Sequence, residues 1–239
     1  MSKNIKEIVG SIDGWLFEKE IFYLYETARG SSKNGVIVEI GSWQGKSTIC
    51  LAKGSQERNR VPVYAIDPHI GSSEHQKDGQ KVWTFEKFKE NIKRAGIEDM
   101  VFPIVKTSED AVKEWDKPIS FLWIDGAHEY EFVKKDFFLW TPFLIDGGVV
   151  AIHDVISSFS GPRRIVLEGI LASDNFYDFS IKSSLFSARY SKTPRKNFFE
   201  RSLWRMWVIL LSFLYVFLGY RLFNISRTLL GFLGITHKK

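Results

Sequence analysis

Apolar and polar positions alternate along this chain in blocks that predict an α/β protein. Short apolar runs with many β-branched residues have the pattern of buried strands. We expect five such strands, near Val36–Ile40, Val63–Ile66, Val101–Val105, Ser120–Ile124 and Val149–Ile152. Apolar residues at helical spacing predict helices between them, at Ser47–Gly54, Thr84–Ala95, Ser108–Trp115 and Glu131–Thr141. Such alternation is typical of a doubly wound, mostly parallel sheet with helices on both faces.

The segments on either side of this alternation complete the predicted domain. An N-terminal helix is indicated by apolar positions that include Trp15, Ile21 and Tyr25, and a later helix is predicted over Arg163–Ala172. Two further runs predict a closing pair of antiparallel strands, Tyr177–Lys182 and Leu185–Tyr190. One polar stretch bounded by glycines is expected to form a mobile lid, Gly71–Gly79.

The most specific motif follows the first predicted strand. The sequence VIVEIGSWQGKST places an acid, Glu39, before two glycines, Gly41 and Gly45. A strand that breaks at glycine before a helix exposes backbone N–H groups, and Ser47 lies in the first turn of that helix. A phosphate-binding P-loop needs four residues between its glycine and the Gly-Lys-Ser/Thr triplet, but this chain has three. A dinucleotide-binding loop has a second glycine at the position that Trp43 occupies here.

The second predicted strand, VPVYAID, ends in the carboxylate of Asp67, about twenty residues after Gly45. In an open α/β sheet such an acid lies beside the glycine loop and can hold a ribose diol. Because the loop fits neither phosphate-binding class, the indicated ligand has ribose and adenine but no phosphate. Glu39 is unfavourable for phosphate and suits an amino-acid ammonium. S-adenosylmethionine has these parts.

With these motifs the chain resembles the class I S-adenosylmethionine-dependent methyltransferases over roughly residues 35 to 192. The family pattern acid-x-Gly-x-x-x-Gly is met by Glu39, Gly41 and Gly45, and the ribose acid is met by Asp67. Two later stretches are similar to a branch of O-methyltransferases associated with sugar and natural-product modification. They read FLWIDGAHEYEFVKKD, from Phe121 to Asp136, and GGVVAIHD, from Gly147 to Asp154. The resemblance implies a Rossmann-like sheet, mostly parallel, with an antiparallel last strand.

The resemblance also implies which residues bind the cofactor. Glu39 would hold the methionine ammonium and Asp67 the ribose. Ser108 follows the third strand, in the usual neighbourhood of the adenine amino group, although it also has the pattern of an N-cap for the next helix. The full predicted cofactor set is Glu39, Gly41, Gly45, Ser47, Asp67, Ser108 and Asp125.

Candidate catalytic residues lie at the ends of the fourth and fifth strands, where open sheets place their ligands. The resemblance implies that Asp125 and Asp154 hold a divalent cation, magnesium or manganese, with His153 as a candidate third ligand. Histidine is the side chain best suited to take a proton from a hydroxyl near neutral pH, so His128 or His153 is the predicted general base. In the alternative interpretation Asp125 caps a helix, Asp154 orients His153, and both histidines are structural.

The distribution of charge excludes one class of partner. Of 33 Lys and Arg and 28 Asp and Glu, eight bases and one acid, Glu200, lie from Arg195 onward. The tail therefore has a net charge of +7 and the preceding residues −2. A sequence-independent grip on nucleic acid needs a cationic face, so we expect no nucleic-acid partner. One cysteine, Cys50, cannot form a disulfide framework, which favours a reducing, cytoplasmic compartment.

The C-terminal tail is hydrophobic as well as basic. Fifteen uncharged residues, MWVILLSFLYVFLGY, run from Met206 to Tyr220, fewer than the roughly 20 that a spanning helix needs. Beyond Gly219 an apolar stripe lies opposite polar residues, the pattern of an interfacial amphipathic helix. Arginines on both sides favour a segment that lies in one leaflet. A spanning helix over Leu203–Phe223 and an apolar dimerisation helix stay open as alternatives.

These observations predict three regions: residues 1–34 as an N-terminal helical cap, 35–193 as the cofactor-binding domain, and 194–239 as a membrane-associating tail. The predicted function is methylation of a hydroxyl on a sugar, glycan or lipid-linked acceptor, by an enzyme held at the inner face of a membrane. A homodimer is also open. Two other functions compete with this one. They are a methyltransferase-fold nucleotide- or metal-binding protein with different chemistry, and a membrane-bound interaction protein without catalysis.

Overall fold

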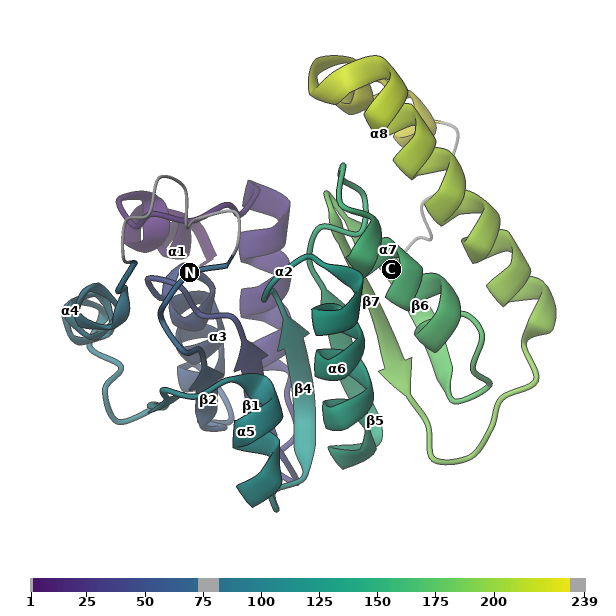
Figure 1. Cartoon of the computed structure of the whole chain (residues 1–239). Helices are drawn as coiled ribbons and strands as arrows, with labels where there is room; N and C mark the ends of the chain where they lie inside the picture. Colours follow the sequence, from purple (N-terminus) through teal and green to yellow (C-terminus); the bar gives the residue numbers. More distant parts are fainter. Residues whose placement is uncertain (1, 73–81, 233–239) are drawn as a thin grey trace.

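The computed structural model describes residues 2–72 and 82–232, which form a seven-stranded sheet with helices on both faces (Figure 1). The strand order is β3-β2-β1-β4-β5-β7-β6. Strands β1 to β5 are parallel, and β7 runs antiparallel to both β5 and β6. The strands are β1 Val36–Ile40, β2 Val63–Ile66, β3 Val101–Ile104, β4 Ile119–Ile124, β5 Leu144–Ile152, β6 Phe176–Lys182 and β7 Leu185–Tyr190. The predicted Rossmann-like sheet with an antiparallel closing strand is confirmed.

The helices agree with the predicted positions in most places and differ in four. The helix α1 was not predicted, and Trp15 lies outside α2. The helix expected over Ser108–Trp115 is divided into α5 and a 3₁₀ turn, and the helix expected over Arg163–Ala172 is divided into α7 and a π-helical turn, η4. Of the predicted lid, only Gly71 and Ser72 are described, and residues 73–79 lie outside the described residues. The helices are α1 Ser2–Gly10, α2 Glu18–Arg29, α3 Lys46–Gln56, α4 Phe85–Ala95, α5 Ser108–Ala111, η2 Val112–Glu114, α6 Tyr130–Trp140, η3 Thr141–Phe143, α7 Ser160–Ile165, η4 Val166–Ile170 and α8 Phe198–Phe232.

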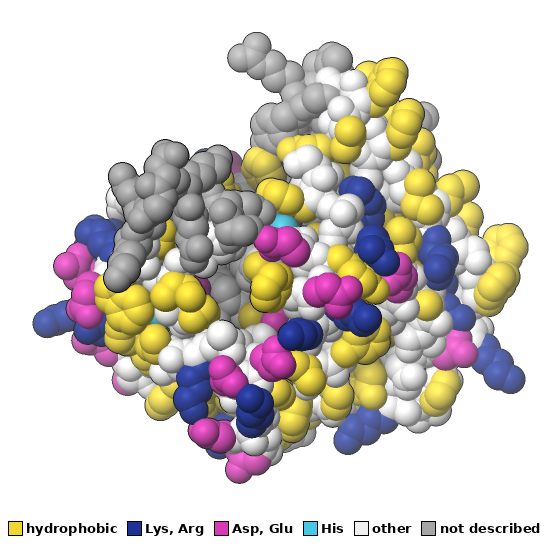
Figure 2. All heavy atoms as spheres, viewed as in Figure 1, with side chains coloured by type: hydrophobic (Ala, Val, Ile, Leu, Met, Phe, Trp, Pro, Cys, Tyr) yellow, Lys and Arg dark blue, Asp and Glu magenta, His cyan; other side chains and the backbone are white. Residues whose placement is uncertain are grey.

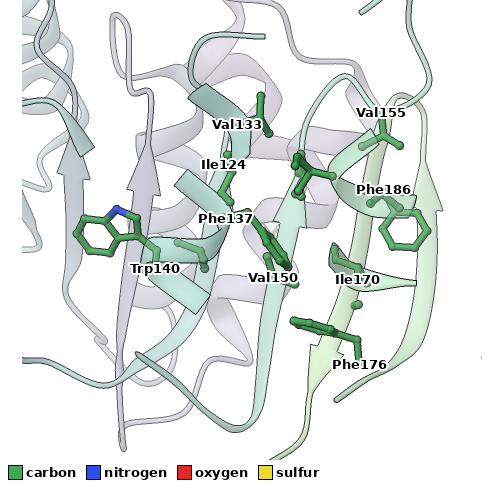
Figure 3. Packing of buried hydrophobic residues seen from close by; sticks show 14 of the residues in the cluster. Ile124, Val133, Phe137, Trp140, Val150, Val155, Ile170, Phe176 and Phe186 are labelled. Carbon is green, nitrogen blue, oxygen red and sulfur yellow. The ribbon is translucent and has the colours of Figure 1, made fainter. Parts of the chain in front are cut away.

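Both faces of the sheet are buried, as expected for parallel strands. All six residues of β4 are buried, and Phe121 to Ile124 alternate between two hydrophobic cores. Leu122 and Ile124 belong to the core that includes residues of α6, α7 and α8, whereas Phe121 and Trp123 belong to the core that includes residues of α1 to α4. Figure 3 shows the first core, where Phe137 and other side chains fill the space between α6 and the sheet.

The strand order brings the functional motifs to one edge of the sheet. The chain moves outward from β1 through β2 to β3 and then returns to the other side of β1, where β4 pairs with it. Ile40 and Ile124 are register partners at the ends of β1 and β4. The residues that follow them, Gly41 and Asp125, therefore lie side by side at the reversal point, where open α/β sheets bind ligands.

Helix α8 is continuous from Phe198 to Phe232, so the predicted change of pattern beyond Gly219 does not interrupt the backbone helix. It runs along the edge formed by β6 and β7 (Figure 1). Its Phe198–Leu218 part is long and apolar enough to cross a membrane by length and composition. However, Val208 and Leu211 within this part are buried against the domain. The first part of the tail is therefore packed onto the α/β core.

The packing of α3 against α2 can be tested by a substitution. Gly54 of α3 lies so close to α2 that an added Cβ would be 2.1 Å from the carbonyl oxygen of Tyr25. Gly54→Ala should lower the free energy of unfolding by about 1–3 kcal/mol, even though alanine favours a helix by about 1 kcal/mol. Urea denaturation measures this difference. The control is Gly10→Ala in α1, where a Cβ meets nothing within 4 Å and stability should not fall. Equal effects of the two changes would contradict the close packing.

Candidate active site

A cavity of about 980 Å³ lies at the carboxyl ends of the parallel strands. Its lining includes Gly41 after β1, Asp67 after β2, Asp125 after β4 and Asp154 after β5. The segment between α1 and α2 and one residue of α8, Tyr215, also line it. The predicted motifs that follow β1, β2, β4 and β5 therefore line one cavity.

The glycine loop is shaped by the strand next to it. Gly41 has φ +86°, and a Cβ there would be 2.2 Å from the carbonyl oxygen of Asp125. Only glycine allows this approach, which leaves the space above the loop open for a ligand. Gly45 also has a positive φ, of 90°, and directly precedes α3. Both glycines have the conformations expected of the loop, and their predicted contacts with the cofactor stay predictions.

Asp67 has a structural role in addition to lining the cavity. One carboxylate oxygen accepts the backbone N–H groups of Ser42 at 2.9 Å and Trp43 at 2.8 Å. The other accepts the N–H of His69 at 2.6 Å. Asp67 therefore fixes the shape of the glycine loop while it faces the cavity, where the predicted ribose contact stays a prediction.

Glu39 lies behind the loop and is not among the residues that line the cavity. Its carboxyl group accepts hydrogen bonds from Ser47 and Thr48, in the first turn of α3. Its other oxygen, Oε1, has no hydrogen-bond partner within residues 2–72 and 82–232. Burial raises the pKa of Glu39 to about 8. Of this group, Ser47 is the residue that reaches the cavity wall.

The segment before α2 folds over the glycine loop, which the sequence did not predict. Asp13 accepts hydrogen bonds at 3.3 Å from the indole of Trp43 and from the amide of Gln44. Lys46 donates to the carbonyl of Gly14 at 2.9 Å. Trp15, expected inside a helix, is 65% exposed and lies 6.1 Å from the Trp43 ring. The N-terminal segment thus closes one side of the cavity.

Ser108 belongs to the site, and the alternative interpretation as an N-cap is wrong. Thr107 is the N-cap of α5, since its side chain accepts the backbone N–H of Asp110. The Ser108 hydroxyl instead donates to the carboxyl group of Asp136, and both residues line the cavity. Burial raises the pKa of Asp136 to about 6. Asp136 was not among the predicted site residues. The sequence signal for it was an acid at a buried position of α6, beside Phe137.

His153 sits at the centre of a cluster of three carboxylates. Its Nδ1 lies 3.0 Å from Asp125 and 3.3 Å from Asp154, and its Nε2 lies 3.2 Å from Glu20. Glu20 is completely buried in α2 and also accepts hydrogen bonds from Phe17 and Ser184. The cluster thus joins α2, β4, β5 and the turn between β6 and β7.

The charges of this cluster determine the protonation of His153. Burial alone lowers the pKa of this imidazole, but the carboxylates of Asp125 and Asp154 outweigh it and raise the pKa well above its usual value. Burial opposes ionisation of Asp154 too, yet His153 and His128 hold its pKa below the usual range. The raised pKa favours the protonated form of His153, whereas burial raises the pKa of Asp125 as well. This arrangement disfavours the predicted role of His153 as a general base.

His128 is placed differently. Its Nε2 lies 3.3 Å from Asp154 Oδ2, and its ring stacks on Phe159 with the ring centroids 4.1 Å apart. Gly161 at the start of α7 approaches so closely that a Cβ there would be 2.1 Å from the His128 carbonyl oxygen. His128 lines the cavity and contacts one carboxylate, which suits a general base.

The predicted metal site does not fit the donor set. The carboxylates of Asp125 and Asp154 lie 3.0 Å and 3.3 Å from His153 Nδ1, so the histidine ring occupies the place between them where magnesium or manganese was expected. Within the part of the chain that the structure describes, no group of three or more His, Cys, Asp or Glu side chains could hold a metal ion. Nor does Asp125 cap a helix, because α6 begins at Tyr130 with Glu129 as its N-cap.

Comparisons with known proteins agree with the fold. Residues 38–155 match the family model described as a methyltransferase domain. The chain is 27% identical over 157 residues to the uncharacterized protein R132 of Acanthamoeba polyphaga mimivirus, a match that covers 64% of this chain and 65% of that protein. The chain thus spans about two thirds of this relative's length.

Two solved methyltransferases share the architecture. The O-methyltransferase TomG from Streptomyces achromogenes, in complex with S-adenosylmethionine, has a TM-score of 0.57 and 15% identity, with 80% of this chain and 87% of TomG covered. The Podospora anserina methyltransferase PaMTH1, bound to S-adenosylhomocysteine, has a TM-score of 0.57 and 14% identity, with 80% and 88% covered. Residues 38–155 thus resemble a methyltransferase domain, and the chain shares the fold of these solved methyltransferases.

The buried Glu39 predicts a pH-dependent stability. Its pKa is about 8 in the folded protein and near the ordinary 4.5 in the unfolded chain. Between these values the folded state keeps a proton that the unfolded state has released. The free energy of unfolding therefore falls as pH rises, by at most about 1.4 kcal/mol per pH unit.

Glu39→Gln removes this titration and should flatten the dependence, so the stability of the variant relative to wild type should increase between about pH 5 and pH 7. Urea denaturation at several pH values measures both curves. Because all other ionisable groups are shared, parallel curves would show that Glu39 is not protonated in the folded protein.

Proposed function

We propose that this protein transfers a methyl group from S-adenosylmethionine to a hydroxyl of a sugar, glycan or lipid-linked acceptor. The observation that carries the proposal is the continuity of the cavity. It extends from the glycine loop and Asp67 to His128 and Asp154, so a cofactor at one end and a proton acceptor at the other share the same space. Methyl transfer needs such proximity between donor and nucleophile.

The residues at the cofactor end fit S-adenosylmethionine. Gly41 leaves room that a side chain would fill, and Asp67 presents a carboxylate beside the loop. Ser108 and Asp136 offer polar atoms on the wall formed by α5 and α6, where an adenine amino group can donate. When bound, the cofactor supplies a methyl group on a positively charged sulfur. The protein's part is to align that methyl group with the acceptor.

The residues at the other end supply the base. We assign the acceptance of the hydroxyl proton to His128, which Phe159 and Gly161 hold in place. As the proton arrives, the carboxylate of Asp154 stabilises the positive charge on the ring. His153 keeps Asp154 ionised and oriented, and Glu20 fixes His153 from the opposite side.

Aromatic side chains support a sugar-bearing acceptor. Phe132, Phe159 and Tyr215 line the cavity together with His128. Aromatic rings offer flat apolar surfaces, and the hydroxyl of tyrosine adds a polar contact. A ligand with alternating apolar faces and hydroxyl groups matches such a lining.

Calorimetry tests the cofactor end of the cavity, and an activity assay tests the His128 end. Asp67→Asn removes the carboxylate that holds the loop, so affinity for S-adenosylhomocysteine should fall by roughly 2 kcal/mol. His128→Ala should leave this affinity unchanged but lower kcat by about 10²–10⁴-fold, measured with acceptor glycans. The matched control is Asp116→Asn, whose carboxylate is 83% exposed and paired with Lys117. No binding of the cofactor by folded wild type would rule out the proposed function.

Removal of divalent cations is the second test. Because the His153 ring occupies the place between Asp125 and Asp154, chelation with EDTA should leave methyl transfer unchanged. His153→Gln keeps the size of the ring approximately but loses the charge, and should reduce turnover in the same assay. Loss of activity in EDTA, with recovery on adding magnesium, would show that the cluster rearranges to bind a metal.

A further inference from the structure

Helix α8 has one face that belongs to the domain. Val208 is completely buried, and Leu211 and Ser212 are 7% and 4% exposed. The Ser212 hydroxyl donates to the carbonyl of Val155 at 3.4 Å, just after the end of β5. Trp204 contacts the rings of β6 and β7 edge to face. This face fixes how α8 lies on the molecule.

The opposite face of α8 is apolar and open to solvent. Phe213 is 60% exposed, and Phe217, whose ring stacks on it, is 75% exposed. Figure 2 shows hydrophobic side chains along this outer side, in yellow at the upper right. Monomeric soluble proteins rarely expose apolar patches of such extent. The exposed apolar residues are Phe198, Phe199, Leu203, Met206, Ile209, Leu210, Phe213, Val216 and Phe217.

The buried face decides how a membrane would meet this helix. Phe198–Leu218 is apolar enough to span, but Val208, Leu211 and Ser212 lie in the middle of it and contact the α/β core. Spanning would detach these residues from the core and leave a hydrophobic surface on β6 and β7 exposed. A helix that keeps this contact can instead lie parallel to the bilayer, with its outer face in the headgroup region.

The charge of the tail identifies the kind of surface. From Arg195 onward the chain has a net charge of +7, whereas the preceding residues have −2. Anionic lipid attracts such a segment by about 1 kcal/mol for each basic residue near the surface. A second copy of the chain would instead bring two tails of the same charge together, which is unfavourable. An anionic bilayer is therefore the occupant that complements both the apolar face of α8 and the net charge of the tail.

We propose that the exposed face of α8 is a monotopic binding surface for an anionic membrane. Tyr215, on the same helix, lines the cavity, so the helix that meets the lipid also forms part of the wall of the site. This second point rests on the proposed function and narrows it, because the acceptor would then be a membrane-borne hydroxyl compound. The membrane contact itself does not depend on catalysis.

Flotation of the full-length protein with lipid vesicles tests the surface. Wild type should float with vesicles of phosphatidylcholine and phosphatidylglycerol, and at least about tenfold less with phosphatidylcholine alone, because of the charge of the tail. Phe213→Glu combined with Phe217→Glu should lower the floated fraction about tenfold, since both side chains would otherwise enter the bilayer. The matched control is Phe138→Glu, a 51% exposed phenylalanine on α6, which should float like wild type.

Calorimetry with S-adenosylhomocysteine on the same preparations separates the two proposals. Retained cofactor binding without flotation of wild type would overturn the membrane surface and leave the proposed function standing. Flotation of a wild-type protein that does not bind the cofactor would support the membrane surface and overturn the proposed function. Light scattering completes the test. If wild type ignores vesicles and is a dimer that the double substitution converts to a monomer, the face of α8 is a contact between copies of the chain.

Discussion

The structure depends on one buried ion cluster, in which His153 is surrounded by Glu20, Asp125 and Asp154. Its members come from α2, from the ends of β4 and β5, and are tied through Ser184 to the turn between β6 and β7. A buried charge is costly unless opposite charges and hydrogen bonds surround it, and here each nitrogen of the ring meets a carboxylate. The cluster therefore fixes the relative positions of the elements at the Asp125 and Asp154 end of the cavity, and removing one partner would leave the others uncompensated.

The same cluster gives His153 and His128 different surroundings. His153 and His128 are both within 3.3 Å of Asp154, yet His153 is enclosed by three carboxylates and His128 contacts one of them and an aromatic ring. The carboxylates raise the pKa of the enclosed ring well above its usual value, whereas the second ring lies at the wall of the cavity. The His153 ring lies 3.0 Å from Asp125 and 3.3 Å from Asp154 and so takes the place between these carboxylates that a metal ion would need.

The features that the sequence predicted well are those set by local pattern. Buried parallel strands such as β4 have continuous apolar runs, and the Gly41 turn has a spacing that distinguishes it from phosphate loops. The partners that the sequence did not reveal lie far apart in the chain. Glu20 contacts His153 across 133 positions of the chain, and Asp136 in α6 contacts Ser108 in α5 across 28 positions. Such contacts follow from strand order and helix placement, which hydrophobic periodicity alone does not determine.

The sequence of the C-terminal tail also does not determine which surface its apolar residues contact. An apolar, aromatic-rich helix is compatible with spanning a bilayer, lying on it or packing on a protein, since all three bury apolar surface. What separates them is which residues the domain already covers, and that depends on tertiary contacts such as the bond from Ser212 to Val155. Val155 directly follows Asp154, the carboxylate shared by both histidines. Helix α8 therefore packs next to the carboxylate that His128 and His153 both contact, which makes it part of the framework of the cavity.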